Sequence, residues 1–184
     1  MTTDGTQRLR ATIALIGLRG CGKSTVGRQL AELLGGECVD TDEVLVRLAG
    51  KSVAAIFADE GEAGFRRRER EVIAQIVAAP PKVVSVGGGA VLDERNVEAL
   101  RRVATLVWLT APVEVLWQRV SADRNTVTSR PALTDRPGLK ELEHLLAVRS
   151  AVYRRAADLI VDTAGRTPFQ ATEAIVMKCG GPGH

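Results

Sequence analysis

The sequence is poor in aromatic residues and contains no long apolar run. Only 3% of its 184 residues are Phe, Trp or Tyr, which leaves no platform of rings on which nucleic-acid bases could stack. The 25 Lys and Arg residues exceed the 22 Asp and Glu residues by a net charge of +3, which suits an anionic small substrate but is too small for a nucleic-acid-binding protein. No apolar stretch approaches the roughly 20 residues of a membrane-spanning helix. We therefore expect neither nucleic acid nor membrane as a partner.

Cysteine is also scarce. Cys21, Cys38 and Cys179 have neither the spacing of a metal site nor that of a CxxC pair, so a reduced, cytoplasmic setting is expected. Residues 1–10 are polar and lack the apolar region of a secretory signal. We expect residues 1–10 and 179–184 to be disordered, and residues 11–178 to form a single domain.

Short apolar runs alternate along the chain with longer stretches of helical pattern. The expected strands are Thr12–Ile16, Glu37–Val39, Val83–Val86, Ala104–Leu109 and Leu159–Val161. The expected helices are Ser24–Leu34, Thr41–Leu48, Val53–Ala78, Asp93–Arg102, Val113–Ala122, Gly138–Ala157 and Pro168–Met177. This order predicts an α/β fold of three layers, α/β/α, with a five-stranded parallel sheet. Residues 123–137 lack apolar periodicity and are expected to form a lid.

The most specific motif is the run Gly17-Leu18-Arg19-Gly20-Cys21-Gly22-Lys23-Ser24-Thr25, which matches the phosphate-loop pattern GxxxxGK[ST]. It lies between an expected strand and an expected helix, as that motif requires. Glycines let the backbone form a concave nest of N–H donors, and the helix N-terminus adds positive potential. We expect Lys23 to reach the β- and γ-phosphates of a nucleotide and the Ser24 hydroxyl to bind Mg²⁺.

Two carboxylates, Asp40 and Asp42, follow the second expected strand. Ligands gather at the carboxyl ends of parallel strands, so one carboxylate is expected beside Mg²⁺ and the other is expected to accept a proton from an attacking hydroxyl. The alternative is that Thr41 or Asp42 only caps the following helix.

Three glycines and two arginines complete the candidate site. Gly87-Gly88-Gly89 follows the third expected strand, where the missing Cβ atoms let the backbone approach a ligand. Arg66 precedes Glu69 by one helical turn, so the carboxylate is expected to orient the guanidinium. Arg66 and Arg149 are candidates for binding a substrate carboxylate in a bidentate manner.

Taken together, these features resemble the shikimate kinase family. The resemblance runs from about Ala11 to Val176, and the elements occur in the family's order. It is carried by the loop GLRGCGKST, Asp40-Thr41-Asp42, Phe57, Gly61…Phe65-Arg66, Gly87-Gly88-Gly89-Ala90, Arg130-Pro131, Arg149…Tyr153-Arg154 and Asp162-Thr163…Arg166-Thr167-Pro168. It implies a P-loop kinase fold of the nucleoside monophosphate kinase type. It also implies transfer of the ATP γ-phosphoryl group to the 3-hydroxyl of shikimate.

The resemblance also implies roles for individual residues. Asp42 would hold the substrate hydroxyls and act as the base, while Lys23 and Arg130 would stabilise charge on the transferred group. The substrate would be bound by Asp42, Arg66, Arg149, Gly88, Gly89, Phe57 and Phe65. The nucleotide would be bound by Gly20, Cys21, Gly22, Lys23, Ser24, Thr25, Arg130, Arg119, Arg166 and Pro168, the last three of these flanking the adenine. Mg²⁺ would be held by Ser24 and Asp40.

Some points stay open at this level. Arg124 and Arg136 compete with Arg130 as the lid arginine that contacts phosphate, and we favour Arg130 because an apolar stretch follows it. Cys21 is either a reactive thiolate beside Lys23 or, as we favour, a small spacer. Gluconate kinases and nucleoside monophosphate kinases share the loop and the lid, and a non-catalytic ATP-binding switch domain is a further alternative. A monomer is expected.

Overall fold

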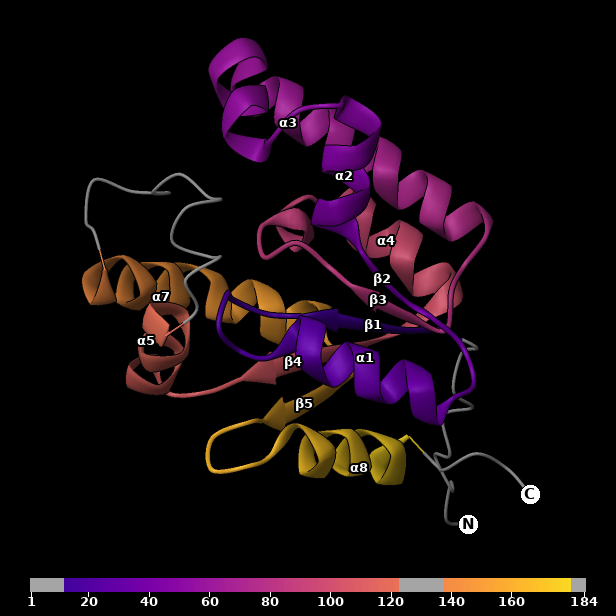
Figure 1. Ribbon diagram of the computed structural model, residues 1–184, viewed down its shortest axis with the longest axis vertical. Coiled ribbons are helices and arrows are strands. Elements are labelled where there is room, and N and C mark those ends of the chain that lie inside the picture. Colours follow the sequence, from indigo (N-terminus) through magenta and orange to yellow (C-terminus); the bar gives the residue numbers. More distant parts are fainter. Residues whose placement is uncertain (1–11, 123–137, 180–184) are drawn as a thin grey trace.

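A five-stranded parallel sheet forms the centre of the computed structural model, which describes residues 12–122 and 138–179 (Figure 1). The strand order is β2-β3-β1-β4-β5. The strands are β1 (Thr12–Ile16), β2 (Cys38–Asp40), β3 (Val83–Ser85), β4 (Ala104–Thr110) and β5 (Leu159–Asp162). All residues of β1 and β3 are buried, as expected for central strands covered on both faces.

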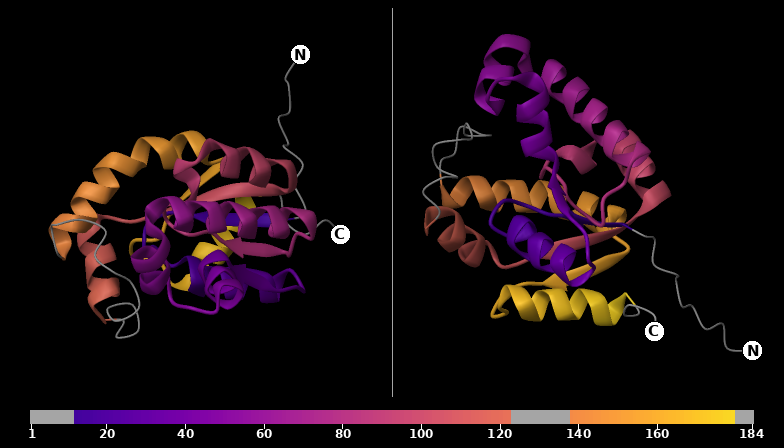
Figure 2. Two further views of the ribbon diagram at one scale, coloured as in Figure 1. Left: turned by 90° about the horizontal axis from the view of Figure 1, so that it is seen from above. Right: turned by 45° about the vertical axis from the view of Figure 1, so that its right-hand side comes forward.

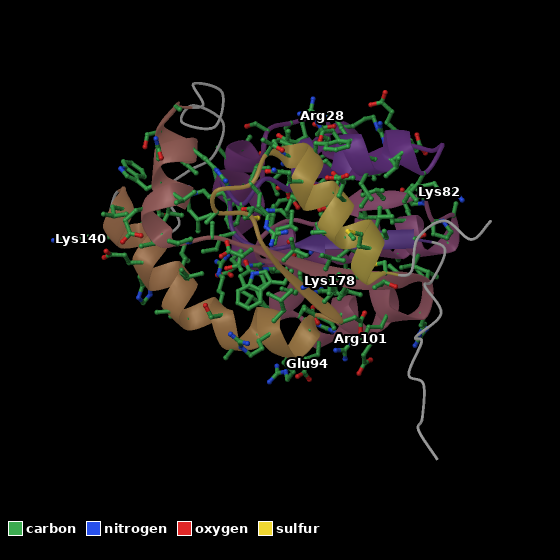
Figure 3. All side chains as sticks on the ribbon, turned by 90° about the horizontal axis from the view of Figure 1, so that it is seen from below. Arg28, Lys82, Glu94, Arg101, Lys140 and Lys178 are labelled. Carbon is green, nitrogen blue, oxygen red and sulfur yellow. The ribbon has the colours of Figure 1, made fainter. Side chains whose placement is uncertain are left out.

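Helices cover both faces of this sheet (Figure 2). Helices α1 and α8 lie side by side on one face, which Figure 3 views directly, while α4 and α7 pack on the other. The helices are α1 (Lys23–Leu33), α2 (Thr41–Ala49), α3 (Val53–Ala78), α4 (Glu94–Val103), α5 (Val113–Ala122), α7 (Leu139–Ala156) and α8 (Pro168–Lys178), with a short 3₁₀ turn η1 (Ala90–Leu92). Within the described residues, no helix has the length and apolar character to cross a membrane.

The three-layer α/β/α prediction is therefore confirmed, with every expected element present and its ends within one residue of the expected position. Parallel pairing aligns the strands so that Leu15 lies opposite Ser85 in β3 and opposite Val107 in β4. As a result, the carboxyl ends of the strands meet along one edge of the sheet. The loops that follow β1 and β3 open on this edge, on the left of Figure 1, and α2 begins there directly after β2.

Helix α3 differs from the expectation because it contains a sharp break at Gly61. The φ of Gly61 is 66° and its ψ is −174°, a conformation that glycine adopts without steric cost. The carboxylate of Glu60 accepts hydrogen bonds across the break from Arg68, at 2.9 Å from Nε, and forms an ion pair with Lys51 at 3.0 Å. Apolar periodicity continues through Gly61, so the sequence pattern alone reads as one helix.

Candidate active site

The phosphate loop joins β1 to α1 and leaves the first turn of that helix open to a ligand. Gly22 is the N-cap of α1, so no side chain caps the helix, and its first turn contains no acidic residue. The first N–H groups of α1 therefore have no side-chain acceptor at the cap position. The ammonium group of Lys23 folds over the loop and donates to the carbonyls of Gly17 at 2.8 Å and Leu18 at 3.0 Å. Backbone donors and a cation thus meet at one point, which is the chemistry of an anion site.

Thr163 and Arg119 contact backbone carbonyls of the phosphate loop. The buried Thr163 hydroxyl lies within hydrogen-bond distance of the Cys21 carbonyl, at 3.2 Å. Arg119 donates to Thr163 Oγ1 at 2.9 Å and to the Gly20 carbonyl at 3.3 Å. A trans peptide points its carbonyl and its N–H in opposite directions, so tying the Cys21 carbonyl toward Thr163 turns the Gly22 N–H away from it. Thr163 entered the sequence analysis only through the resemblance, without a role, although it directly follows β5.

Asp40, at the end of β2, uses both carboxylate oxygens. Its Oδ2 accepts from the Ser85 hydroxyl at 2.8 Å and from the Ser24 hydroxyl at 3.2 Å. Its Oδ1 accepts from the Asp42 N–H at 2.9 Å, which makes Asp40 the N-cap of α2. The alternative that Thr41 or Asp42 provides this cap was therefore wrong, because the helix begins one residue earlier than that alternative requires. Thr41 is instead buried and accepts from the Gly87 N–H at 2.8 Å.

The pairing of Ser24 and Asp40 is suited to a hard divalent cation. Mg²⁺ prefers oxygen donors and is typically held by one or two protein side chains together with water and phosphate oxygens. A hydroxyl and a carboxylate from the first turn of α1 and the end of β2 meet that requirement beside the phosphate loop. The described residues contain no group of three or more His, Cys, Asp or Glu that could enclose a metal.

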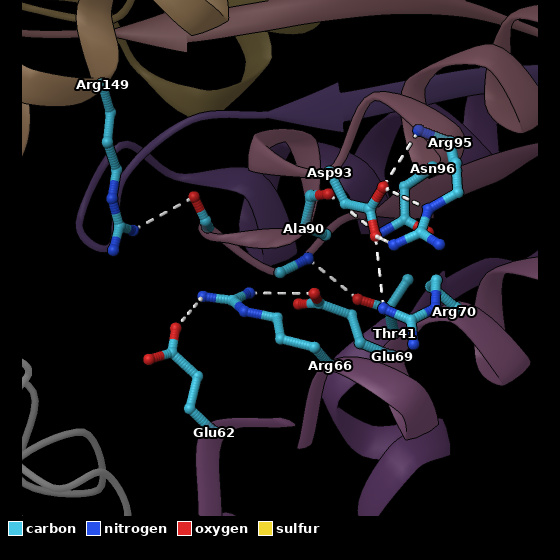
Figure 4. A network of polar contacts seen from close by, with 12 residues as sticks. Thr41, Glu62, Arg66, Glu69, Arg70, Ala90, Asp93, Arg95, Asn96 and Arg149 are labelled. Carbon is cyan, nitrogen blue, oxygen red and sulfur yellow. Dashed lines mark hydrogen bonds and ion pairs between the residues drawn. The ribbon is translucent and has the colours of Figure 1, made fainter. Parts of the chain in front are cut away.

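A pocket lies next to the phosphate loop and collects the predicted substrate residues. Asp42, Arg66 and Arg149 line it together, although they come from α2, α3 and α7. In Figure 4, Arg66 and Arg149 extend toward the same space. The complete lining is Leu18, Arg19, Asp42, Val53, Phe57, Phe65, Arg66, Glu69, Gly87, Gly88, Gly89, Leu145 and Arg149. Leu18 and Arg19 belong to the phosphate loop, so the pocket and the loop share a wall.

Arg66 is held in place by two carboxylates and by an aromatic ring. Its guanidinium forms an ion pair with Glu69 at 2.9 Å and with Glu62 at 3.4 Å (Figure 4). It also lies 5.6 Å from the centroid of the Phe65 ring. Glu69 is 3% exposed, and burial raises the pKa of its carboxyl while the charge of Arg66 opposes that rise. The expected orientation of Arg66 by Glu69 is confirmed. Phe57 and Phe65 stack with ring centroids 4.6 Å apart and line the same pocket.

Arg149 and Tyr153 share one acceptor, the carbonyl of Gly88. Tyr153 donates to it at 2.5 Å and Arg149 at 3.2 Å. The two side chains lie one turn apart on α7 and therefore on the same face of the helix. Tyr153 is fully buried against Trp108, and burial raises the pKa of its phenol to about 12. Tyr153 entered the sequence analysis only through the resemblance, without a role.

Each of the three glycines after β3 lies against a different polar group. A Cβ on Gly87 would lie 2.7 Å from Asp42 Oδ1, and one on Gly89 would lie 2.8 Å from the Arg66 guanidinium. A Cβ on Gly88 would lie 3.3 Å from the Gly17 carbonyl. A side chain at any of these positions would displace part of the pocket or press on the phosphate loop. The close backbone approach expected of these glycines is thus found toward the pocket residues themselves.

Other predicted residues lie at the edge of the site or outside the described part. Arg166 and Pro168 are exposed, just before α8 and at its start. Cys21 is 1% exposed, with its Sγ 3.8 Å from Lys23 Nζ, and this burial favours the spacer interpretation over a reactive thiolate. Arg124, Arg130 and Arg136, with the whole expected lid, lie outside the described residues.

Comparison with known proteins shows which proteins this chain resembles in sequence and in structure. A family model described as shikimate kinase matches residues 19–179. A shikimate kinase of Symbiobacterium thermophilum is 46% identical over 90% of this chain and 94% of that protein, and shikimate kinase 2 of Dickeya chrysanthemi is 47% identical over 82% and 86%. The solved structure of shikimate kinase from Acinetobacter baumannii in complex with shikimate is 35% identical, has a TM-score of 0.84 and covers 93% of each chain.

Proposed function

The chain belongs to the shikimate kinase family, and from this premise we propose how its residues transfer the γ-phosphoryl group of ATP to the 3-hydroxyl of shikimate. A single observation carries the proposal. Asp42, Arg66 and Arg149, from three separate helices, line a pocket that shares Leu18 and Arg19 with the phosphate loop. An acceptor in that pocket lies next to a triphosphate on the loop. Phosphoryl transfer depends mainly on such placement and on charge neutralisation.

Shikimate is a ring that carries hydroxyls and one carboxylate, and the pocket offers a partner for each part. The guanidinium groups of Arg66 and Arg149, with the backbone of Gly88 and Gly89, bind the carboxylate. The stacked rings of Phe57 and Phe65 pack on the apolar parts of the substrate ring. Asp42 holds the hydroxyls and accepts the proton of the attacking one. Its place against Gly87 supports this assignment.

The nucleotide occupies the phosphate loop. The N–H groups of Gly20, Cys21, Gly22, Ser24 and Thr25 bind phosphate oxygens, and Lys23 exchanges its contacts with the loop carbonyls for contacts with the β- and γ-phosphates. Arg119, Arg166 and Pro168 flank the adenine. The contact of Arg119 with the Gly20 carbonyl of the loop supports its part in this role. Arg166 lies just before α8 and Pro168 at its start. Arg130, within residues 123–137, is proposed to stabilise charge on the transferred group.

Ser24 and Asp40 are the residues that would hold Mg²⁺. When bound there, the ion supplies positive charge at the β- and γ-phosphate oxygens. Ser85 orients Asp40 through its hydroxyl at 2.8 Å, so the carboxylate faces Ser24 before a ligand arrives. We further propose that the protein works in a reducing compartment, the cytoplasm, in keeping with three cysteines that form no disulfide. We also propose that it is a monomer.

Other phosphoryl acceptors fit the pocket less well. Gluconate carries a carboxylate but has no ring to pack on Phe57 and Phe65. The phosphate of AMP carries more negative charge, which the carboxylates of Asp42 and Glu69 beside the pocket arginines would repel. A non-catalytic ATP switch would not need a base beside a substrate pocket. A coupled ATP-consumption assay with shikimate, gluconate and AMP separates these alternatives.

The deciding experiment is the turnover of shikimate with Mg²⁺ and ATP, repeated on Asp42→Asn. Loss of the base is expected to lower kcat by about 10²- to 10⁴-fold, while ATP affinity stays within a factor of two or three of the parent. Asp59→Asn, which makes the same chemical change in an exposed ion pair with Lys51, is the matched control and should retain parental kcat. An Asp42→Asn enzyme with parental kcat would remove Asp42 from the mechanism.

A further inference from the structure

Helix α7 presents four buried residues at successive intervals of four. Glu141, Leu145, Arg149 and Tyr153 are all buried, and this spacing places them on one face of the helix. Leu145 and Arg149 line the pocket, while Tyr153 bonds to the Gly88 carbonyl. The first member of the row, Glu141, lies in the first turn of α7 and does not line the pocket. Its burial at 2% exposure therefore requires a separate explanation.

The partner of Glu141 is Arg19, the third residue of the phosphate loop. The Arg19 guanidinium donates to Glu141 Oε2 in an ion pair whose side chains are 14% and 3% exposed. Arg19 also lines the substrate pocket, and its Nε is buried without a hydrogen-bond partner. The contact joins residues 122 positions apart in the sequence. It is a direct connection between the loop that binds phosphate and the helix that carries Arg149.

Stability alone is a poor explanation for such a pair. Removing two charges from water costs about as much as their attraction returns, so replacing a buried ion pair by neutral residues is often neutral or stabilising. What a buried pair does provide is a fixed geometry, because moving its two charges apart inside a poorly solvated interior is costly. Glu141 also gains from its place at the N-terminal end of α7, where a negative charge is favoured.

We propose that the Arg19–Glu141 ion pair is a positioning device that sets the spacing between the phosphate loop and the substrate-binding face of α7. The inference rests on the phosphoryl transfer proposed above. Arg149 lies eight residues beyond Glu141, which is about 12 Å along a rigid helix, so fixing one end of this segment fixes the other. In-line attack tolerates little error, since a misplacement of about 1 Å can cost 10²-fold in rate.

The test compares Glu141→Gln, Arg19→Met and the double variant that carries both changes. Each single variant removes one charge of the buried pair and keeps the other, so both lower activity and thermal stability. The double variant leaves neither charge, so its unfolding temperature returns toward that of the parent. Its kcat is nevertheless expected to stay at least tenfold below the parent, with KM values for ATP and shikimate changed less than threefold. The ratio of ATP hydrolysed to shikimate phosphorylated is expected to rise, because a misaligned acceptor competes less well with water.

The matched control is the ion pair between Arg155 of α7 and Glu94 of α4, whose side chains are 69% and 77% exposed. Arg155→Met and Glu94→Gln should leave kcat and the coupling ratio unchanged. A double variant that recovers both stability and kcat would reduce the Arg19–Glu141 pair to a packing element and overturn the proposal. A Glu141→Gln enzyme with parental kcat and a lowered KM for shikimate would also overturn it, because Arg19 would then be a direct substrate ligand. If the single variants do not fold, the double variant decides. Failure of the parent to phosphorylate shikimate would count against the proposed function instead.

Discussion

The Ser24 hydroxyl lies 3.2 Å from Asp40 Oδ2, which brings the first turn of α1 and the end of β2 to one oxygen-rich point. The other oxygen of the same carboxylate caps α2. A single side chain therefore supports a helix and faces the phosphate loop. The two roles can be separated by substitution, because they depend on different properties of the carboxylate.

Asp40→Asn is expected to weaken Mg²⁺ use while keeping the fold. Asn caps a helix about as well as Asp, so the unfolding temperature should change little. The amide lacks the negative charge that a hard cation prefers, so the Mg²⁺ concentration for half-maximal activity should rise about tenfold or more. Titration of activity with Mg²⁺ at saturating ATP and shikimate measures this. Asp40→Ala, which also removes the cap, should in addition lose about 1 kcal/mol of stability, and an Asn variant with an unchanged Mg²⁺ requirement would contradict the assignment.

Alanine at Gly87 and at Gly89 is expected to damage different steps. A methyl at Gly89 meets the Arg66 guanidinium and should raise the KM for shikimate about tenfold, since Arg66 is a proposed ligand of the substrate carboxylate. A methyl at Gly87 meets the Asp42 carboxylate and should mainly lower kcat, since Asp42 is the proposed base. Steady-state kinetics on both variants distinguish these effects, with each variant serving as the control for the other. Identical changes in both enzymes would indicate general distortion of the loop.

Tyr153→Phe removes the phenolic donor to the Gly88 carbonyl but keeps the ring against Trp108. The lost hydrogen bond should lower the free energy of unfolding by about 1 kcal/mol. The KM for shikimate should rise severalfold, because Gly88 and Arg149 shift together, while the KM for ATP stays near the parental value. Because burial raises the pKa of Tyr153 to about 12, the phenol keeps its proton at neutral and moderately alkaline pH. The parental KM for shikimate should therefore show no tyrosine titration below pH 10. A rise of equal size in both KM values would argue against a local effect.

Thr163→Val is expected to loosen the phosphate loop without changing the shikimate pocket. Valine matches threonine in shape but removes the hydroxyl that joins Arg119 and the Cys21 carbonyl. We expect the KM for ATP to rise about tenfold and the KM for shikimate to change less than twofold. Thr172→Val is the matched control, because Thr172 is equally buried and its hydroxyl donates to the Pro168 carbonyl of its own helix. Equal effects of the two substitutions on the KM for ATP would show that the Thr163 hydroxyl does not stabilise the phosphate loop.

Glu60 makes the stability of the break in α3 dependent on pH. Hydrogen bonds from Arg68 and then Lys51 lower the pKa of its carboxyl from 4.5 to about 2. The unfolded chain therefore takes up this proton first, and the stabilisation is present above pH 4.5 and is lost as pH falls toward 2. Glu60→Gln should lower the urea midpoint at pH 7 by more than it does at pH 3. Glu94→Gln, at an exposed position, should shift the midpoint little at either pH, and a pH-independent effect of Glu60→Gln would contradict this account.

The layers of the fold could be predicted because local pattern and global structure agree. Buried parallel strands appear in the sequence as short apolar runs such as Thr12–Ile16. The phosphate-loop motif predicts the strand before it and the helix after it. The strand-end rule then located Asp40, Asp42 and the glycines on one edge of the sheet. The contact between Arg66 and Glu69 also followed from helical spacing alone.

Contacts between distant segments could not be predicted in the same way. The partner of Arg19 lies on α7. The Gly20 carbonyl accepts from Arg119, and the Cys21 carbonyl lies within hydrogen-bond distance of Thr163, more than ninety positions away in each case. No periodicity encodes such pairs, because they arise only after the sheet has ordered its strands. The cap of α2 was misassigned for a local reason, since Asp40, Thr41 and Asp42 are all good capping residues and the sequence does not indicate which one is extended.

The break at Gly61 allows two aromatic side chains to form one wall of the pocket. In an uninterrupted helix, Phe57 and Phe65 would sit about 12 Å apart along the axis, too far for their rings to meet. Because the helix is broken at one residue without a side chain, the two rings instead stack, with 4.6 Å between their centroids. A protein with very few aromatic residues thus builds a stacked aromatic surface in its pocket from two of its three phenylalanines, and a single break in one helix makes this possible.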